Sequence, residues 1–347
     1  DPSALREAAC REGLAGVVYA RLKGRGLPRA VLSPLEDLYR HIAARNLANL
    51  EALGGIEDAL RKTRIDVLVL KGASLLDYVY SGIGMRPMGD IDLMVRPGDL
   101  QGFANILCGL GYRRDPVLSH LFRREGVIVD LHTHALNTDR IAARTALFPL
   151  GMAPVWRRAV PWKLESRRLK RPEDRDNVLL LSQHLMKHSF SGLIWLTDIH
   201  ELLRNRDLGF WKGLSRRAKA LRQQRPLSYS LYLLNRVFGL EPPPGSGLEH
   251  PAAGISRIER GLLGARAAGR SIAPMGPLLA LFCIPGSRKR AAFLWETLFP
   301  KRGVVRKEFS RAFRGRRTAF CMYRLIRAAK AARGQLSLIL HGLVRGS

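Results

Sequence analysis

Cysteine, negative charge and long apolar runs are all scarce in this chain of 347 residues. The four cysteines (Cys10, Cys108, Cys283 and Cys321) lie far apart and form no Cys-x-x-Cys pair. This spacing argues against a disulfide framework or a thiolate zinc site, and it predicts buried thiols in a reducing cytoplasm. No apolar run approaches the roughly 18–20 residues that span a bilayer, so we expect no transmembrane segment. The sequence therefore predicts a cytoplasmic protein with room for two domains, or for one domain with a large helical extension.

The shortage of acidic residues leaves the chain strongly basic. Lysine and arginine number 58 against 29 acidic residues, which gives a formal net charge of +29, and residues 251–347 hold 20 basic but only 3 acidic residues. Such a surface attracts polyanions, although a genome rich in arginine codons would produce much of the same excess. The basic C-terminal helices, which carry Arg311, Arg314, Arg316, Arg317, Arg324, Arg327 and Lys330, are a candidate polyanion contact, and a solvated or phosphate-facing surface is the favoured interpretation. The basic face is compatible with binding to RNA, with binding to a membrane surface, or with exposure to solvent alone.

Apolar periodicity divides the chain into three segments. Residues 1–64 are predicted to be helical, with helices over about 3–22 and 33–64. Residues 65–138 are rich in strand signals, and we expect strands over 66–70, 91–95, 118–123 and 127–132, with helices over 73–80 and 100–110. Residues 139–347 are predicted to be helical again, with a candidate linker at 241–247. The expected fold class is α/β (α+β): a small mixed sheet with N-terminal helices and a large, all-helical C-terminal region.

Two aspartates stand on one predicted strand, in the string Gly89-Asp90-Ile91-Asp92-Leu93. Because side chains alternate between the two faces of a strand, Asp90 and Asp92 point the same way. Two carboxylates about 7 Å apart along a strand repel each other, and a cation between them stabilises both as anions. Mg²⁺ (or Mn²⁺) suits hard carboxylate oxygens, so we predict that Asp90 and Asp92 are metal ligands.

A third aspartate lies on the strand predicted over 127–132. By the same alternation Asp130, His132 and His134 share one face of that strand. If the two strands are neighbours, three carboxylates meet on one sheet surface, which is the arrangement that two-metal phosphoryl or nucleotidyl transfer needs. We therefore expect Asp130 to be the third metal ligand and catalytic carboxylate. For His132 and His134, a structural or supporting role is favoured over metal ligation.

A glycine turn, Leu70-Lys71-Gly72-Ala73-Ser74, links the first predicted strand to the helix expected over 73–80. A glycine at a helix N-terminus lets a phosphate approach the backbone N–H groups, and the Ser74 hydroxyl can add a hydrogen bond. Lys71 and Arg86 are placed to neutralise phosphate charge. We therefore predict a nucleotide-binding site made of Lys71, Gly72, Ser74 and Arg86.

Three further polar residues stand on a predicted helix outside this segment. His184 and His188 are four residues apart, a spacing that also suits metal ligands. Because no nearby carboxylate completes a His-Glu-x-x-His zinc motif, we predict instead that His184, Lys187 or His188 contacts the substrate, with an ordinary packed histidine pair as the alternative. Asp198, in an apolar stretch, is either a buried polar anchor or a substrate contact.

These motifs together resemble a known family. The string from Leu70-Lys71-Gly72 through Gly89–Val95 to Val129-Asp130-Leu131-His132 is similar to the polymerase-β-like superfamily of nucleotidyltransferases, specifically the poorly characterised nucleotidyltransferase family 5. The helical stretch 174–203 is similar to that family as well. The resemblance implies that Gly72 and Ser74 serve the triphosphate, that Asp90 and Asp92 bind metals, and that Asp130 is the third carboxylate. The chain departs from the superfamily pattern at Ala73, where Gly or Ser is usual, and in its longer gap from Gly72 to Asp90.

The resemblance and the carboxylates point to one reaction. We expect Mg²⁺-dependent transfer of a nucleoside monophosphate from a nucleoside triphosphate to an acceptor hydroxyl or phosphate, with release of pyrophosphate. A small molecule or a peptide is the favoured acceptor. Two alternatives remain: an enzyme that modifies RNA or tRNA, and a non-catalytic polyanion-binding protein that retains the fold.

Overall fold

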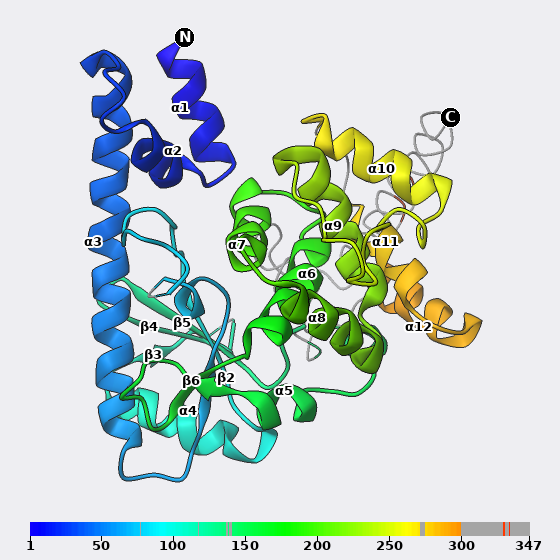
Figure 1. Ribbon diagram of the computed structural model, residues 1–347. Helices are drawn as coiled ribbons and strands as arrows, with labels where there is room; N and C mark the ends of the chain where they lie inside the picture. The colour runs from blue at the N-terminus through cyan, green and yellow to red at the C-terminus, as the bar shows by residue number, and fades with distance from the viewer. Residues whose placement is uncertain are drawn as a thin grey trace. The chain divides into compact units, whose positions relative to one another are not determined.

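The computed structural model describes residues 1–76, 78–116, 118–136, 138, 141–270 and 275–299, together with residues 329 and 333. The chain divides into two compact units (Figure 1). The sheet unit comprises residues 1–135, 153–177 and 191–202, and the helical unit comprises 136–152, 178–190 and the described part of 203–347. Each basic residue named for the candidate polyanion contact, from Arg311 to Lys330, lies outside the described residues.

Three helices open the sheet unit: α1 (Pro2–Arg11), α2 (Ala15–Leu22) and α3 (Arg29–Leu60). The single helix predicted over 3–22 is wrong, because Gly13 adopts a positive φ of 72° and breaks it in two. A side chain at Gly13 would also collide with Ile194, whose Cγ2 would lie 2.8 Å from the added Cβ. The long helix α3 runs beside the strands in Figure 1 and buries Leu53, Ile56 and Leu60 in the core of the unit.

Seven strands form one mixed sheet in the order β3-β4-β5-β2-β1-β7-β6. Their bounds are Val67–Val69 (β1), Ile91–Met94 (β2), Arg113–Arg114 (β3), Leu121–Arg124 (β4), Val127–His132 (β5), Val160–Pro161 (β6) and Leu169–Arg171 (β7). The strands predicted over 66–70, 91–95, 118–123 and 127–132 are confirmed with small shifts of their ends. The turn between β4 and β5 is confirmed too, because Glu125 and Gly126 both have positive φ, at 49° and 82°.

Residues after position 138 also contribute to the sheet, through β6 and β7. Strand β7 pairs in parallel with β1, with Val67 opposite Leu169. Glu57 on α3 fixes this segment, because its carboxylate accepts hydrogen bonds from the backbone N–H groups of residues 167, 168 and 169 at 2.8, 3.1 and 2.7 Å. The fold class is the expected mixture of helices around a mixed sheet, but the region beyond residue 138 is not purely helical.

The apolar face of the sheet follows the predicted alternation. Ile91, Leu93, Val129 and Leu131 all belong to one buried cluster. Helix α4 (Leu100–Gly109) adds Phe103 and Leu107 to the same cluster, and these two side chains are fully buried. Because Asp92 and Asp130 alternate with these apolar residues along β2 and β5, their side chains are directed to the other face.

The helix expected over 73–80 is wrong. In its place the chain forms a short 3₁₀ turn, η1 (Lys71–Ser74), followed by irregular turns. Lys71 adopts a positive φ of 52°, and the hydroxyl of Ser74 donates to the carbonyl of Lys71 at 2.8 Å, which closes the turn on itself. The carbonyl of Ala73 accepts a hydrogen bond from the indole N–H of Trp162 at 3.0 Å. These contacts hold a tight 3₁₀ turn in place of the predicted α-helix N-terminus.

The helical unit is made mostly of α-helices. Helix α5 (Ala153–Arg158), the first turn of α6 (Asp174–Lys187) and most of α7 (Leu193–Leu203) belong to the sheet unit, whereas the rest of α6 belongs to the helical unit. The helical unit continues with α8 (Leu208–Leu221), α9 (Gln224–Phe238), α10 (Arg257–Ala267), α11 (Gly276–Cys283) and α12 (Ser287–Leu298). Residues 241–247, the predicted linker, connect α9 to α10. Among the helices described here, none is both long and apolar enough to cross a membrane.

The cysteines correct one expectation. Cys10 and Cys108 are exposed and Cys283 is half-buried, whereas buried thiols were predicted. All three are free thiols, and the fourth, Cys321, lies outside the described residues. Both exposed cysteines sit on outward faces of short helices, where the sequence has too little periodicity to assign a face.

Candidate metal and nucleotide site

The register of the sheet brings two of the predicted aspartates together. Strand β2 pairs in parallel with β5, and Asp92 lies directly opposite Asp130. One oxygen of each aspartate and a ring nitrogen of His132 all lie within 4.8 Å of one another. The prediction that the Asp130 strand lies beside the Asp92 strand is therefore confirmed, and His132 joins the two carboxylates. We call Asp92, Asp130 and His132, with Lys71, the carboxylate cluster.

Asp90 stands at the edge of this group. It precedes β2, in a bend, and its side chain is exposed. The protein atoms that displace water from its carboxyl, and then the negative charge of Asp92, raise the pKa of Asp90 to about 6. A carboxyl with a raised pKa next to other carboxylates is a group that a bound cation would stabilise in its charged form.

Positive charge inside the carboxylate cluster comes from the chain itself. The ammonium of Lys71 contacts Oδ1 of Asp92 in a short hydrogen bond. Nε2 of His132 lies 3.0 Å from Oδ1 of Asp92 and 3.2 Å from Oδ2 of Asp130. Asp92 and Asp130 thus share His132, and Lys71 adds a positive charge at Asp92, so side chains of the chain itself balance part of the negative charge.

The pKa shifts follow from these contacts. Burial by itself would raise the pKa of Asp92, but the positive charge of Lys71 and the hydrogen bond from His132 outweigh it, so this pKa is lowered. Burial opposes the charged form of Lys71 as well, yet Asp92 raises its pKa. For His132, burial again disfavours the charge, and hydrogen bonds to Asp130 and Asp92 reverse the effect and raise the pKa. At neutral pH Asp92 is therefore an anion, held by the ammonium of Lys71 and by its hydrogen bond with His132.

The cluster is not fully satisfied. Oδ1 of Asp130 is buried and has no hydrogen-bond partner among the described residues, and its ion-pair contact is with Nε2 of His120, at 3.9 Å. A buried carboxylate oxygen without a donor loses hydration with no compensation. Together with the close packing of three ligand atoms, this oxygen fits a bound cation, because a cation would supply the missing partner.

Arg86 forms a separate buried ion pair. Its guanidinium, in a side chain only 6% exposed, donates from Nε to Oδ1 of Asp198 at 3.2 Å and from Nη2 to Oδ2 at 2.8 Å. The hydroxyl of Tyr80 donates to the same carboxylate at 2.6 Å. Burial acts against the charge of Arg86, but Asp198 raises its pKa further above the usual value. Asp198 is therefore a buried anchor for Arg86, and the Arg86 charge already has a partner.

The Arg86 pair also explains Gly72. A Cβ at position 72 would overlap the guanidinium of Arg86 and lie 3.1 Å from Cγ of Met88. The guanidinium cannot swing aside easily, because Asp198 and the carbonyl of Pro87 hold three of its N–H groups. Glycine at position 72 is thus required by packing against Arg86, whatever its part in nucleotide binding.

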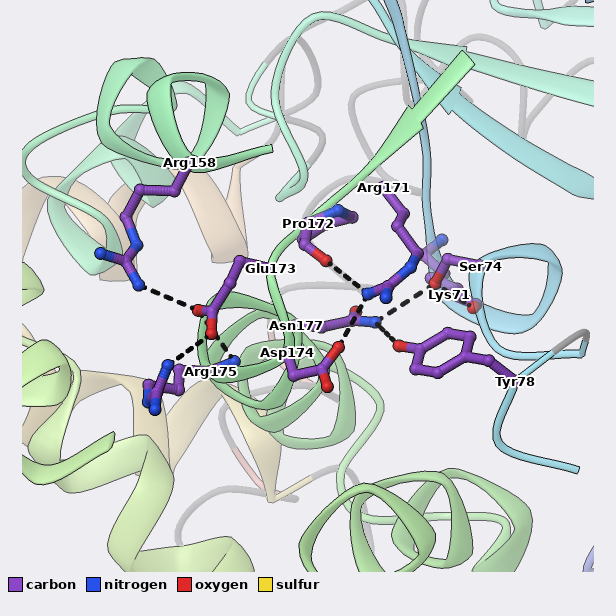
Figure 2. A network of polar contacts seen from close by, with 10 residues as sticks. All are labelled: Lys71, Ser74, Tyr78, Arg158, Arg171, Pro172, Glu173, Asp174, Arg175 and Asn177. Carbon is purple, nitrogen blue, oxygen red and sulfur yellow. Dashed lines mark hydrogen bonds and ion pairs between the residues drawn. The ribbon is translucent and has the colours of Figure 1, made fainter. Parts of the chain in front are cut away.

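Ser74 takes part in a second polar network, shown in Figure 2. The side-chain amide of Asn177 donates to the hydroxyls of Ser74 and Tyr78, both at 3.3 Å. Arg171 lies over the ring of Tyr78, with Cζ 4.0 Å from the ring centroid, and its Nη1 donates to Asp174 at 2.7 Å. Asn177, Tyr78 and Arg171 were not predicted as site residues. The asparagine that directly precedes the apolar run Val178–Leu181 of α6 was the available signal for the first of them.

Of the remaining predicted residues, three belong to the helical unit and His134 belongs to the sheet unit. His184, Lys187 and His188 belong to the helical unit, where the rings of His184 and His188 lie with centroids 4.5 Å apart. Contact of these three with a substrate stays a prediction. His134 follows β5 in the sheet unit, and burial lowers its pKa to about 4, so it is neutral at physiological pH.

Comparison with known proteins adds one finding. Residues 1–239, more than half of the chain, match the model of a family described as uncharacterised nucleotidyltransferases. The matched range contains the whole carboxylate cluster and the turn η1. No curated protein and no solved structure matches the chain.

Proposed function

The chain belongs to this nucleotidyltransferase family, and on that premise we propose that it transfers a nucleoside monophosphate from a nucleoside triphosphate to an acceptor, with Mg²⁺ or Mn²⁺ held at the carboxylate cluster. The observation that carries the proposal is the register of β2 and β5, which sets Asp92 opposite Asp130. Family membership supports nucleotidyl transfer in general. The metal, the triphosphate and the acceptor are the proposed part.

Asp92 and Asp130 would hold the metal, with Asp90 available at the edge of the cluster. The metal would neutralise triphosphate charge and stabilise the pyrophosphate leaving group. Two features support this assignment: the buried Oδ1 of Asp130 that has no partner in the described residues, and the raised pKa of Asp90. Carboxylate oxygens are also the ligands that Mg²⁺ and Mn²⁺ prefer.

Lys71 has two partners in this proposal. In the structure its ammonium contacts Asp92, and its side chain is 18% exposed. With a cation held by Asp92 and Asp130, Lys71 would be free to leave Asp92 and to neutralise a phosphate of the triphosphate, as a point charge on a flexible stem can do. His132 keeps its hydrogen bonds to both aspartates and so orients them.

Arg86 and Ser74 then stabilise the η1 turn that carries Lys71. Arg86 holds the backbone of the η1 turn by packing on Gly72, and Ser74 closes the turn through its own hydrogen bond to Lys71. Both roles position Lys71. Direct contact of Gly72, Ser74 or Arg86 with the triphosphate remains a proposal that needs the turn to open.

A small molecule or a peptide is the proposed acceptor, with RNA second. The RNA alternative draws on the net charge of +29. We propose a reducing cytoplasm as the compartment, because Cys10 and Cys108 are exposed free thiols, which persist best under reducing conditions.

The test measures pyrophosphate release. Purified protein is incubated with each labelled nucleoside triphosphate, Mg²⁺ and a cell extract, and we expect release of pyrophosphate and transfer of label to one extract fraction. Asp92→Asn should lower the rate by about three orders of magnitude, whereas the control Asp58→Asn, on the exposed surface of α3, should leave it unchanged.

The fraction that takes up label separates the alternatives. Label on a tRNA pool would favour the RNA-directed enzyme over the small-molecule or peptide one. The proposed function is overturned if the protein releases no pyrophosphate, binds RNA with a steep salt dependence, and binds RNA equally well after Asp92→Asn. This outcome would identify a polyanion-binding protein.

A further inference from the structure

The helical unit contains a second site, separate in its residues from the carboxylate cluster. A cavity of about 420 Å³ opens where α8 ends, α9 begins and α11 ends. This volume lies in the range of sites for small organic ligands. The polar residues around the cavity are Arg222, Gln224, Arg225 and Ser228, and its apolar wall includes Pro149 and Phe282. We call it the α9 pocket.

Arg225 is the fixed polar group of the α9 pocket. Its Nε and Nη2 donate to the two carboxylate oxygens of Glu259, both at 2.7 Å, and Glu259 is completely buried. The hydroxyl of Tyr229 donates to the same carboxylate. This bidentate pair holds the guanidinium in one orientation, and no hydrogen bond of its Nη1 is found in the described part of the chain. Arg225 is therefore preorganised to donate to a ligand.

Three further side chains around the α9 pocket have unused hydrogen-bonding groups. Within the described ranges, no hydrogen bond or ion pair involves the side chain of Arg222, Gln224 or Ser228. Arg222 follows α8 in the left-handed conformation, with φ at 57°, and this turn places it between α8 and α9. The charge of Arg225 is balanced by Glu259, whereas that of Arg222 is not. The pocket therefore has one excess positive charge and several free donors.

The apolar wall determines the rest of the ligand. The ring of Phe282 has the guanidinium of Arg225 5.5 Å from its centroid, so a planar group can lie against both. Cys283 also lines the cavity, and burial raises the pKa of its thiol to about 12. The thiol is thus protonated and is no nucleophile at neutral pH, so the α9 pocket is a site for reversible binding.

We propose that the α9 pocket binds a small organic anion: one oxyanion group, phosphate monoester or carboxylate, attached to a planar apolar body. Arg222, Ser228 and the free edge of Arg225 receive the oxyanion, and Phe282 receives the planar body. Neither Asp92 nor Asp130 takes part, so this site stands whether or not the chain transfers nucleotides.

The first experiment measures binding by isothermal titration calorimetry on the full chain. The probes are phenyl phosphate, benzoate and inorganic phosphate. Phenyl phosphate or benzoate should bind with a Kd below 1 mM, and the better of the two identifies the oxyanion. Inorganic phosphate should bind at least about tenfold more weakly, because it has no planar body to cover Phe282. Equal binding of all three probes, or binding of none, overturns the proposal.

Substitutions then test whether the better probe binds in the α9 pocket. Arg222→Gln should weaken the better probe at least about tenfold, and Ser228→Ala about threefold. The control Arg216→Gln removes the same charge from an exposed position on α8 that does not line the pocket, and it should change nothing. An equal loss in Arg216→Gln would show attraction to the general basic surface and would contradict a built site.

One more variant separates this site from the proposed metal site. Asp92→Asn should leave the Kd of the better probe unchanged, because the α9 pocket shares no residue with the carboxylate cluster. Loss of probe binding in Asp92→Asn would place the probe at the carboxylate cluster and overturn the proposal. If Asp92→Asn abolishes pyrophosphate release but leaves the Kd of the probe unchanged, the proposal for the α9 pocket is supported.

Discussion

Each unit buries a group of charged side chains, and the two groups differ in how completely they are satisfied. In the helical unit one acid, Glu259, meets Arg225, Tyr229 and the backbone N–H of Ser256, which leaves neither carboxylate oxygen without a donor. In the sheet unit Asp92 and Asp130 share Lys71 and His132, and one buried oxygen has no partner in the described ranges.

This difference separates a structural ion pair from a candidate site. A buried acid with one matched base and all its hydrogen bonds contributes to stability only if both partners stay. A cluster with surplus carboxylates is less stable than it could be, and proteins retain such arrangements where function requires them. We therefore expect mutations in the two groups to affect different measurements.

The largest expected effect on stability is at the satisfied group. Glu259→Ala leaves Arg225 and the hydroxyl of Tyr229 without their carboxylate, so we expect the free energy of unfolding to fall by roughly 3 kcal/mol. Chemical denaturation measures this change. The exposed pair of Glu36 and Arg40 is the control, and Glu36→Ala should cost about 0.5 kcal/mol or less. Equal losses at the two positions would remove the contrast between buried and exposed pairs.

Acid should weaken the same group. Burial would raise the pKa of Glu259, but its hydrogen bonds, first the one from Arg225, lower it below 4.5. The unfolded chain therefore binds the proton more readily, so the stabilisation is complete above pH 4.5 and is lost as the pH falls through the lowered folded-state pKa. Denaturation at a series of pH values should show a pH-dependent loss that Glu259→Gln lacks, and identical slopes would contradict this assignment.

The next effect concerns Gly72, in the η1 turn that positions Lys71 of the carboxylate cluster. Gly72→Ala places a methyl group against the guanidinium of Arg86, and we expect a loss of about 1–3 kcal/mol in the free energy of unfolding. Gly89→Ala is the control, because a Cβ there meets nothing within 4 Å. If Gly72→Ala instead keeps full stability and raises only the KM for the nucleoside triphosphate, Gly72 serves phosphate approach and the packing argument is wrong.

A smaller effect is expected at Lys71. Its ammonium competes with a metal for Oδ1 of Asp92, so Lys71→Met should tighten Mn²⁺ binding by about five- to tenfold, or roughly 1 kcal/mol. Titration calorimetry without nucleotide gives the Kd. Lys62→Met, at an exposed position on the segment after α3, should leave it unchanged. Weaker metal binding in Lys71→Met would show that Lys71 supports the metal instead of competing with it.

The strand face of Asp92 and of Asp130 was accessible from the sequence, because the alternation of apolar and polar residues over 91–95 and 127–132 reports it locally. The register that sets the two residues opposite each other was not, because it depends on how two distant strands align. Strand β7, which pairs with β1, was not predicted, because Leu169-Lys170-Arg171 is short and has one apolar residue. Its place in the sheet depends on Glu57, more than a hundred residues earlier.

The turn after β1 shows most clearly which features could not be predicted from the sequence. Apolar residues from Ala73 onward suggested a helix, but Lys71 adopts a left-handed conformation and Arg86 packs on Gly72. The position of Arg86 depends on Asp198, which is distant in sequence. The counter-charges of the cluster were hidden for the same reason: Lys71 was assigned to phosphate and His132 to support, and only the folded chain places both against Asp92.

The most direct test of the account is metal uptake at the carboxylate cluster. Mn²⁺ or Mg²⁺ is titrated calorimetrically into the full chain, alone and with a non-hydrolysable nucleoside triphosphate. We predict saturable binding that the nucleotide strengthens and that Asp92→Asn and Asp130→Asn each abolish, with both variants remaining folded by circular dichroism. Absence of uptake even with nucleotide, or uptake that both variants retain, would contradict it.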